Sequence, residues 1–185
     1  PAAIAKVSGA KKAVLPPFVE PSLALQVERP PSSPGWIHEI KHDGYRIEAR
    51  LDGGKVKLLT RKGLDWTKRF PTVAEAVKAL AAKAALIDGE IIVQDEKGNA
   101  DFSGLQSDLK AGRHDRMVYY AFDLLYLDGL DLRGAPLHER KRLLKELIAA
   151  SPEAFALRFN DHLADIGEDI LVAACRLGLE GIVSK

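Results

Sequence analysis

The chain has 185 residues, with 27 Lys and Arg against 26 Asp and Glu and a formal net charge of +1. A content of 46% hydrophobic and 29% charged residues is typical of a globular domain and excludes a disordered or fibrous protein. No uncharged apolar run approaches the roughly 18 residues that a membrane span needs, and a net charge near zero argues against a strongly basic nucleic-acid binder.

The beginning of the chain is predicted to be irregular. Residues 1–15 are rich in alanine, include three lysines and lack the long apolar core of a secretory signal. Six prolines between Pro16 and Pro34 are expected to delay regular structure. We therefore expect residues 1–17 to be a linker or N-terminal tail and residues 18–185 to form the domain.

Predicted strands and helices alternate from Trp36 onward. The turn Asp52-Gly53-Gly54 predicts a hairpin, Thr72 and Glu75 predict a capping box, and Gly112 is expected to end a helix. The irregular strand spacing favours an α+β fold with mixed or antiparallel sheets flanked by helices. We expect strands over 36–40, 47–51, 56–60, 86–94, 117–127, 155–159 and 181–184, and helices over 72–83, 103–110, 136–149 and 166–177.

The segment Glu39–Arg46 places chemically useful residues at the end of a predicted strand. Lys41 is a candidate nucleophile, because strand ends and the loops after them present active groups. A nucleophilic lysine must lose its proton, so we expect burial and a nearby cation such as Arg46 or a metal ion to lower its pKa. Gly44 is expected to let the backbone approach a ligand closely. The simpler interpretation is a Lys–Asp pair in a turn, since turns favour Asp-Gly.

The run Lys41-His42-Asp43-Gly44-Tyr45-Arg46 resembles the Lys-x-Asp-Gly-x-Arg motif of the covalent nucleotidyltransferases, which include ATP-dependent DNA ligases, RNA ligases and mRNA capping enzymes. In that family the lysine attacks the α-phosphate and forms a lysyl–nucleotide phosphoramidate. The resemblance implies that Lys41 is catalytic, that Arg46 contacts the sugar and phosphates, and that Asp43 orients Lys41 or a 3′-hydroxyl. His42 stands where these ligases often have an aromatic residue.

Four further segments match motifs of this family in the same order along the chain. They are Thr60-Arg61-Lys62-Gly63, Asp88-Gly89-Glu90, Tyr120-Ala121-Phe122-Asp123 and Glu180-Gly181-Ile182-Val183-Ser184-Lys185. The resemblance implies that Glu90 contacts the ribose or a metal ion and that Glu180 helps to hold that metal, which we expect to be Mg²⁺ or Mn²⁺. On its own, Asp-Gly-Glu is equally well explained as a bulge between two exposed acids.

The same resemblance assigns the nucleotide contacts. Phe122 is expected to stack on adenine, which the Glu39–Ile40 backbone or the Glu39 carboxylate would also contact. Arg61 is expected near the nucleotide and the nicked-strand phosphate, and Lys185 near the phosphates. Taken alone, Phe122 in an apolar strand is more often a core residue, and Lys185 could be a solvated terminal lysine.

The sequence around these motifs is most similar to the ligase domain of bacterial ligase D, the multifunctional enzyme of non-homologous end joining, and the resemblance covers residues 18–185. It implies the ATP-grasp-like nucleotidyltransferase domain of covalent ligases. Such a domain carries AMP on Lys41, passes it to a DNA 5′-phosphate and allows strand sealing in DNA repair. The family's fifth motif and its oligonucleotide-binding barrel would lie beyond Lys185, so we expect a C-terminally truncated domain that is impaired alone.

The expected partners follow from this resemblance. They are ATP, nicked or broken double-stranded DNA, polymerase or nuclease domains in the full protein, and an end-binding protein. No membrane is expected. The single cysteine, Cys175, suits a reducing compartment, and we expect the bacterial cytoplasm, at the nucleoid.

Three alternatives remain at this stage. The chain could be an RNA ligase or a GTP-using capping enzyme, since both share the lysine motif. It could also be a non-catalytic fragment that binds DNA or a partner protein, or a domain whose matches are accidental. The order of the motifs argues against accidental matches, and the similarity to ligase D around them favours DNA over RNA.

The charges are unevenly distributed along the chain, which the net charge does not show. Residues 1–71 hold 13 Lys and Arg against 7 Asp and Glu, which is +6, whereas residues 72–185 hold 14 against 19, which is −5. The first part is expected to face phosphates and the second contains the proposed metal ligands. The net charge near zero therefore does not exclude a nucleic-acid partner.

Overall fold

A seven-stranded sheet forms the body of the molecule in the computed structural model, which describes residues 7–164 and 166–185. The strands follow the order β1-β7-β6-β5-β3-β4, and β8 pairs with β6. Only the β6–β8 pair is parallel. The strands are β1 (Lys11–Lys12), β3 (Tyr45–Asp52), β4 (Lys55–Thr60), β5 (Ala84–Ile92), β6 (Val118–Leu127), β7 (Leu130–Asp131) and β8 (Leu157–Phe159).

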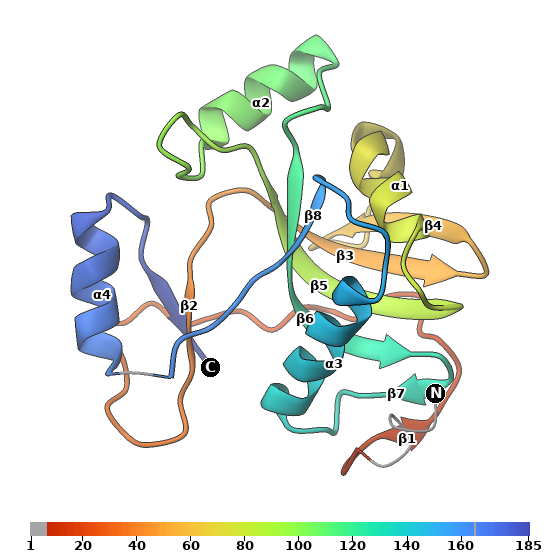
Figure 1. The fold of residues 1–185 in the computed structure, drawn as a ribbon, viewed down its shortest axis with the longest axis horizontal. Coiled ribbons are helices and arrows are strands. Elements are labelled where there is room, and N and C mark those ends of the chain that lie inside the picture. Colours follow the sequence, from red (N-terminus) through yellow and green to blue (C-terminus); the bar gives the residue numbers. More distant parts are fainter. Residues whose placement is uncertain (1–6, 165) are drawn as a thin grey trace.

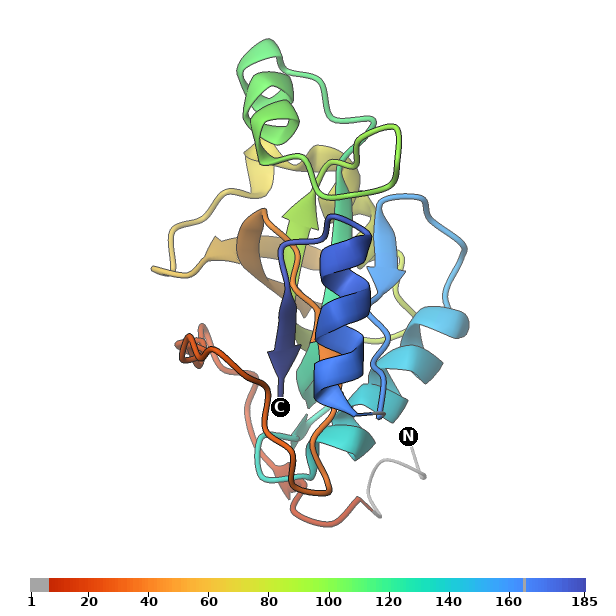
Figure 2. The ribbon, with the colours of Figure 1, turned by 90° about the vertical axis from the view of Figure 1, so that its left-hand side faces the viewer.

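A second, two-stranded sheet pairs β2 (His38–Ile40) with β9 (Ile182–Ser184) in antiparallel register. Figures 1 and 2 show this small sheet beside α4 (Gly167–Arg176), to one side of the large sheet. The other helices are the 3₁₀ turn η2 (Thr67–Arg69), α1 (Pro71–Lys78), α2 (Phe102–Ala111) and α3 (Leu137–Ala149). None of the helices in the described ranges combines the length and apolarity needed to cross a bilayer. The expected α+β fold with mixed or antiparallel sheets is confirmed.

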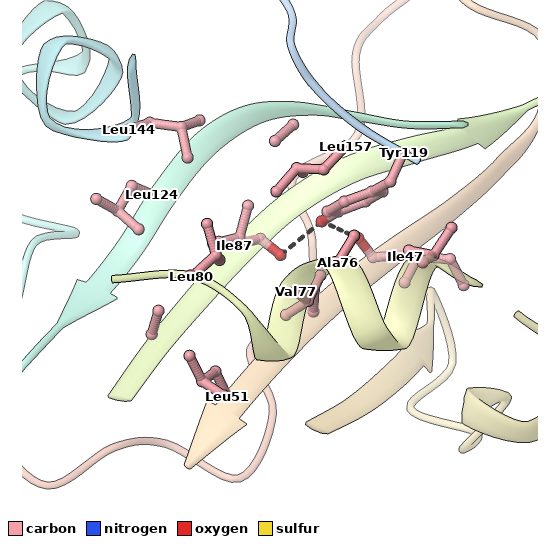
Figure 3. Packing of buried hydrophobic residues seen from close by; sticks show 14 of the residues in the cluster. Ile47, Leu51, Ala76, Val77, Leu80, Ile87, Tyr119, Leu124, Leu144 and Leu157 are labelled. Carbon is pink, nitrogen blue, oxygen red and sulfur yellow. Dashed lines mark hydrogen bonds between the residues drawn. The ribbon is translucent and has the colours of Figure 1, made fainter. Parts of the chain in front are cut away.

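One face of the large sheet forms the core. Alternate side chains of β3 and β5, such as Ile47 and Ile87, are fully buried against α1 and α3. Tyr119 of β6 is also fully buried, and its hydroxyl lies 2.9 Å from the carbonyl oxygens of both Ile47 and Ile87 (Figure 3). The phenol therefore joins three adjacent strands within an otherwise apolar layer.

The opposite face of the same strands is polar. Arg46 of β3 stands opposite Glu90 of β5, and Glu48 stands opposite Asp88. Because side chains alternate across a strand, the residues that build the core also place these charged groups together on the other face. This polar face becomes one wall of the site described below.

The α1 helix begins differently from the sequence prediction. Thr72 does not cap it: the N-cap is Phe70, Pro71 occupies the first turn, and the Thr72 hydroxyl donates to the carbonyl oxygen of His114. The helix also ends at Lys78 rather than near residue 83. The capping-box prediction is wrong because proline already favours a helix start one residue earlier.

The α2 helix confirms its predicted end. Gly112 follows the helix in the left-handed conformation, with φ 67°, as a C-terminal glycine should. The start is set by Asp101, whose carboxylate accepts a hydrogen bond of 2.8 Å from the amide of Gly104.

Regular structure begins earlier than the prolines predicted. Lys11 and Lys12 form β1 at the edge of the large sheet, paired with β7, and Val7 is buried in the core. The Tyr126 hydroxyl donates to the carbonyl oxygen of Ala13 at 3.0 Å. Residues 7–13 are thus packed on the domain. Residues 1–6 of the expected tail lie outside the described residues.

Candidate nucleotide-binding site

A cavity of about 840 Å³ lies between the polar face of the large sheet and the two-stranded sheet. Nearly every residue to which the sequence assigned a role lines this cavity. Those residues are Glu39, Ile40, Lys41, Asp43, Arg46, Arg61, Glu90, Phe122 and Lys185. Glu180 is not part of the lining, but its carboxylate contacts the amine of Lys41. Segments from five separate parts of the chain therefore converge on one space.

Lys41 sits where β2 ends. Its amide donates to the carbonyl oxygen of Gly181 at 3.0 Å, which extends the β2–β9 pairing by one residue. Its side chain is 46% exposed and ion-paired with Glu180. The expected burial of this lysine is therefore wrong, because the two-stranded sheet leaves the side chain at the cavity mouth. Glu180, from the segment just before β9, holds the amine instead.

Asp43 is exposed and lines the cavity, and no hydrogen bond among the described residues joins it to Lys41. The structure shows a steric constraint that favours glycine at Gly44. A Cβ added there would lie 2.2 Å from the carbonyl oxygen of Ile91 in β5. Glycine is required because the backbone passes close to the neighbouring strand, and because Gly44 also lines the cavity, the expected close approach of a ligand stays a prediction.

Arg46 is fixed by the protein itself. Its guanidinium binds both carboxylate oxygens of Asp88, at 3.1 and 2.7 Å, and its third nitrogen donates to the carbonyl oxygen of Ser22 at 2.8 Å. A bidentate pair of this kind fixes the plane of the guanidinium. The expected contacts of Arg46 with sugar and phosphates would have to compete with these bonds. Arg61, on the turn after β4, is exposed at the border of the same cavity.

The acidic residues Asp88 and Glu90 project toward the cavity from β5. The pKa of Glu90 is raised to about 8, chiefly by burial and also by the charges of Asp88 and Asp43, against the opposing effect of Arg46 and Lys41. Gly89 lies at a register shift between β5 and β6, as the bulge alternative expected, but it and Asp88 are buried, and a Cβ on Gly89 would lie 2.5 Å from the ring of Tyr119. The middle glycine of this motif therefore makes room for a core tyrosine.

These carboxylates are suited to a hard cation. Glu90 and Glu180 both act on Lys41, the first through its charge and the second by contact. Mg²⁺ typically takes one or two protein carboxylates and fills the remaining positions with water and phosphate oxygens. Within the described ranges, no group of three or more His, Cys, Asp and Glu residues is placed to hold a metal. The residue types suit such an ion, and the metal role of this pair stays a prediction.

Phe122 faces the cavity and is not a member of the core cluster. The Lys185 ammonium lies 4.1 Å from the centre of its ring, and the Arg46 guanidinium carbon lies 5.4 Å from it. An aromatic face in contact with cations is a suitable platform for a planar base. The alternative in which Phe122 is a core residue is thereby excluded.

Glu39 is the most constrained acidic group of the site. It is 2% exposed and accepts hydrogen bonds from Lys141 at 2.7 Å, Lys185 at 2.8 Å and Asn160 at 3.2 Å. The Glu39 carboxylate, one of the two groups expected to contact adenine, is therefore already hydrogen-bonded to these three donors. The Lys185 ammonium therefore contacts the Glu39 carboxylate and the Phe122 ring, whereas it was expected to lie near the phosphates.

The sequence analysis missed Lys141 and Asn160. Lys141 is 1% exposed on α3, and it lies four residues after Leu137 and three before Leu144. That spacing puts a lysine on the apolar face of the helix, which is the one signal that could have identified it. Asn160 follows the short strand β8, and nothing in its local sequence distinguishes it.

Comparison with known proteins agrees with this geometry. The family described as ATP dependent DNA ligase domain matches residues 22–185. The multifunctional non-homologous end joining protein LigD of Pseudomonas aeruginosa is 42% identical over 174 residues, which is 94% of this chain and 20% of that protein. The chain thus spans about one fifth of the length of this relative.

Two solved structures are also similar. The crystal structure of the ligase domain of Mycobacterium tuberculosis LigD has a TM-score of 0.70 and 33% identity, covering 81% of this chain and 48% of that one. A mycobacterial DNA ligase D complexed with ATP and MES has a TM-score of 0.68 and 34% identity, with the same coverage. The fold, the convergent motifs and the family match lead to one conclusion: this chain, which resembles ligase domains of the LigD type, belongs to the ATP-dependent DNA ligase domain family.

Proposed function

We propose that the chain is the adenylating part of a DNA ligase, in which Lys41 takes AMP from ATP and passes it to a DNA 5′-phosphate. The observation that carries this proposal is the position of the Lys41 amine. Lys41 lines the same cavity as the ring of Phe122 and the cationic side chains of Arg46 and Lys185. A nucleophile, a base platform and positive charge are the parts that nucleotidyl transfer requires.

The chemistry follows from the groups in the cavity. The Lys41 nitrogen, released from Glu180 and deprotonated, attacks the α-phosphorus of ATP. An N–P bond forms, the bond from that phosphorus to the pyrophosphate oxygen breaks, and pyrophosphate leaves with its electron pair. An oxygen of a DNA 5′-phosphate then attacks the same phosphorus and breaks the N–P bond. Finally the adjacent 3′-hydroxyl attacks the 5′-phosphorus and AMP departs.

The protein groups have separate tasks in this scheme. Phe122 would hold adenine by stacking, and Asp88 would fix the orientation of the Arg46 guanidinium beside the ring. Glu90 and Glu180 would hold Mg²⁺ or Mn²⁺, which offsets negative charge on the phosphates when it is bound. The carboxylate of Glu180 would then no longer hold the Lys41 amine as an ion pair.

The DNA partner is supported by the distribution of charge and by the relatives. Residues 1–71 carry 13 Lys and Arg against 7 Asp and Glu, and Arg61 lies at the cavity border. The relatives named above are a multifunctional end-joining protein and DNA ligases. We extend the proposal to nicked or broken duplex DNA, to repair by end joining beside polymerase or nuclease domains and an end-binding protein, and to the bacterial cytoplasm.

The test is the mass of the protein after incubation with ATP and Mg²⁺, measured on the longest natural chain that contains these 185 residues. We expect the mass to rise by one AMP and to return to its starting value when nicked duplex DNA is added. The adduct should resist base and be lost in acid, as a phosphoramidate is. GTP in place of ATP, and nicked RNA in place of DNA, test the RNA-ligase and capping alternatives.

Two variants make the outcome decisive. Lys41→Ala should take up no AMP, whereas Lys97→Ala, which changes an exposed lysine outside the cavity lining, should still take it up. An adduct on Lys41→Ala would overturn the proposal. Failure of the unmodified protein to bind AMP covalently would favour the non-catalytic alternative.

A further inference from the structure

The residues on both sides of Lys41 are held by one side chain from a distant part of the chain. The amide nitrogen of Asn160 donates to Glu39 at 3.2 Å, and its amide oxygen lies 3.1 Å from the Nε2 atom of His42. Glu39 precedes Lys41 by two residues and His42 follows it directly. Asn160 is 6% exposed and lies, with His42, at the wall of the cavity.

The position of Asn160 is itself fixed. Its backbone amide donates to the carbonyl oxygen of Ala121 in β6 at 2.8 Å, and its own carbonyl accepts a bond of 2.8 Å from the buried Lys141 ammonium. Lys141 also donates to Glu39 at 2.7 Å. The large sheet, α3 and the residues around Lys41 are therefore joined through one asparagine and one lysine.

The hydrogen-bond pattern determines the state of His42. Because the Asn160 nitrogen donates to Glu39, its oxygen must accept, and Nε2 of His42 must carry a proton. The His42 ring also lies 4.5 Å from the ring of Tyr120. Its orientation is thus set by a neighbouring ring and by one directed bond.

Lys41 has no comparable restraint on its side chain. That side chain is 46% exposed, and its one ion pair is with Glu180, which is itself 42% exposed. Correct placement of the amine must come from the backbone on either side of it. A displacement of about 1 Å at a reacting atom can cost roughly 100-fold in rate.

We propose that Asn160 is a positioning residue for AMP transfer, which acts by holding His42 and Glu39 so that the Lys41 amine faces the cavity. This inference rests on the proposed function. It predicts that Asn160 influences the rate of the chemical step more than the affinity for ATP, because its side chain contacts the flanks of the nucleophile.

The experiment measures the rate of AMP adduct formation at a series of ATP concentrations, on the longest natural chain that contains these residues. We expect Asn160→Ala to lower the rate at saturating ATP roughly 10- to 100-fold, with the half-saturating ATP concentration changed by less than about threefold. His42→Leu, which leaves Asn160 and its backbone bonds intact, should lower the same rate. His42→Gln retains an N–H donor near the position of Nε2 and should restore most of it.

The double variant tests whether the two residues act together. If Asn160 works through His42, combining Asn160→Ala with His42→Leu should cost less than the product of the two single effects. Multiplied effects, or wild-type rates in a folded Asn160→Ala protein, would overturn the inference while leaving the proposed function intact. If the unmodified protein takes up no AMP, the proposed function fails and the inference fails with it.

Discussion

Glu48 illustrates how burial changes the pKa of a single carboxyl group. It lies on the polar face of β3, is 6% exposed, and accepts hydrogen bonds of 3.1 and 3.2 Å from the amide of Val19. The pKa of its carboxyl is raised to about 7, chiefly by burial and also by the charge of Asp88, while the Val19 amide, Arg133 and Arg50 act in the opposite direction. The segment around Val19 lines the nucleotide cavity, so this carboxyl holds one of its walls.

This environment predicts a pH dependence of stability. The folded state holds the Glu48 proton more tightly than the unfolded chain does, so its contribution is complete below about pH 4.5 and is lost as pH rises to about 7. Relative to Glu48→Gln, the unmodified protein should lose up to about 1.4 kcal/mol of unfolding free energy per pH unit in that window. Urea unfolding of both proteins across this range measures the difference. Parallel curves would contradict the burial of an ionisable carboxyl here.

The helices α1 and α2 show that similar local sequences can start helices in different ways. Both have a polar residue suitable for capping, Thr72 and Asp101. Asp101 does accept a bond from the amide of Gly104, whereas the Thr72 hydroxyl bonds to the carbonyl oxygen of His114. The difference is decided by what precedes each residue, because Pro71 has already started α1.

The two residues therefore form a matched pair of variants. Asp101→Ala should lower the free energy of unfolding by about 1 kcal/mol, within the usual range for loss of an N-cap. Thr72→Ala removes an exposed contact and should change it by less than about 0.5 kcal/mol. Chemical denaturation of both variants measures this. A larger effect of Thr72→Ala would mean that the contact with His114 matters more than a helix cap.

At the scale of the whole molecule, we expect the two sheets on either side of the cavity to differ in their stability against local unfolding. The central strands β5 and β6 are largely buried, whereas β2 and β9 have three residues each and pack beside α4. Exposed apolar side chains accompany α4, including Ile166 and Leu177, each 68% exposed. Short strands with less buried apolar surface open more easily.

Amide hydrogen exchange should reveal this difference. We expect the β2–β9 amides to exchange at least about tenfold faster than those of β5, because they open locally while the core remains folded. Binding of ATP should slow exchange in β2 and β9, since residues of both sheets line the cavity. Equal protection of both sheets without ATP would show that they unfold as one unit.

The sequence alone indicated most of the strands and helices and the family to which the chain belongs, although it did not predict the short strands β1 and β7. Alternation in β3 and β5, the Asp-Gly-Gly hairpin and Gly112 are local effects of backbone geometry, which act wherever the residues occur. Likewise, the residue types at Lys41, Glu90 and Phe122 limit the possible chemistry, and the structure places them around one cavity.

Only the tertiary structure decided how the site is held. Gly44 and Gly89 are glycines because of Ile91 and Tyr119, which are distant in the sequence. The contact of Glu180 with Lys41, and the network that joins Glu39 to Asn160 and Lys141, likewise link residues more than 100 positions apart. Packing and buried hydrogen bonds depend on which segments of the chain come into contact in the fold, and local sequence patterns do not specify those tertiary contacts. For this reason the sequence indicated a candidate nucleophile, and the folded chain shows which distant residues contact it and its neighbours.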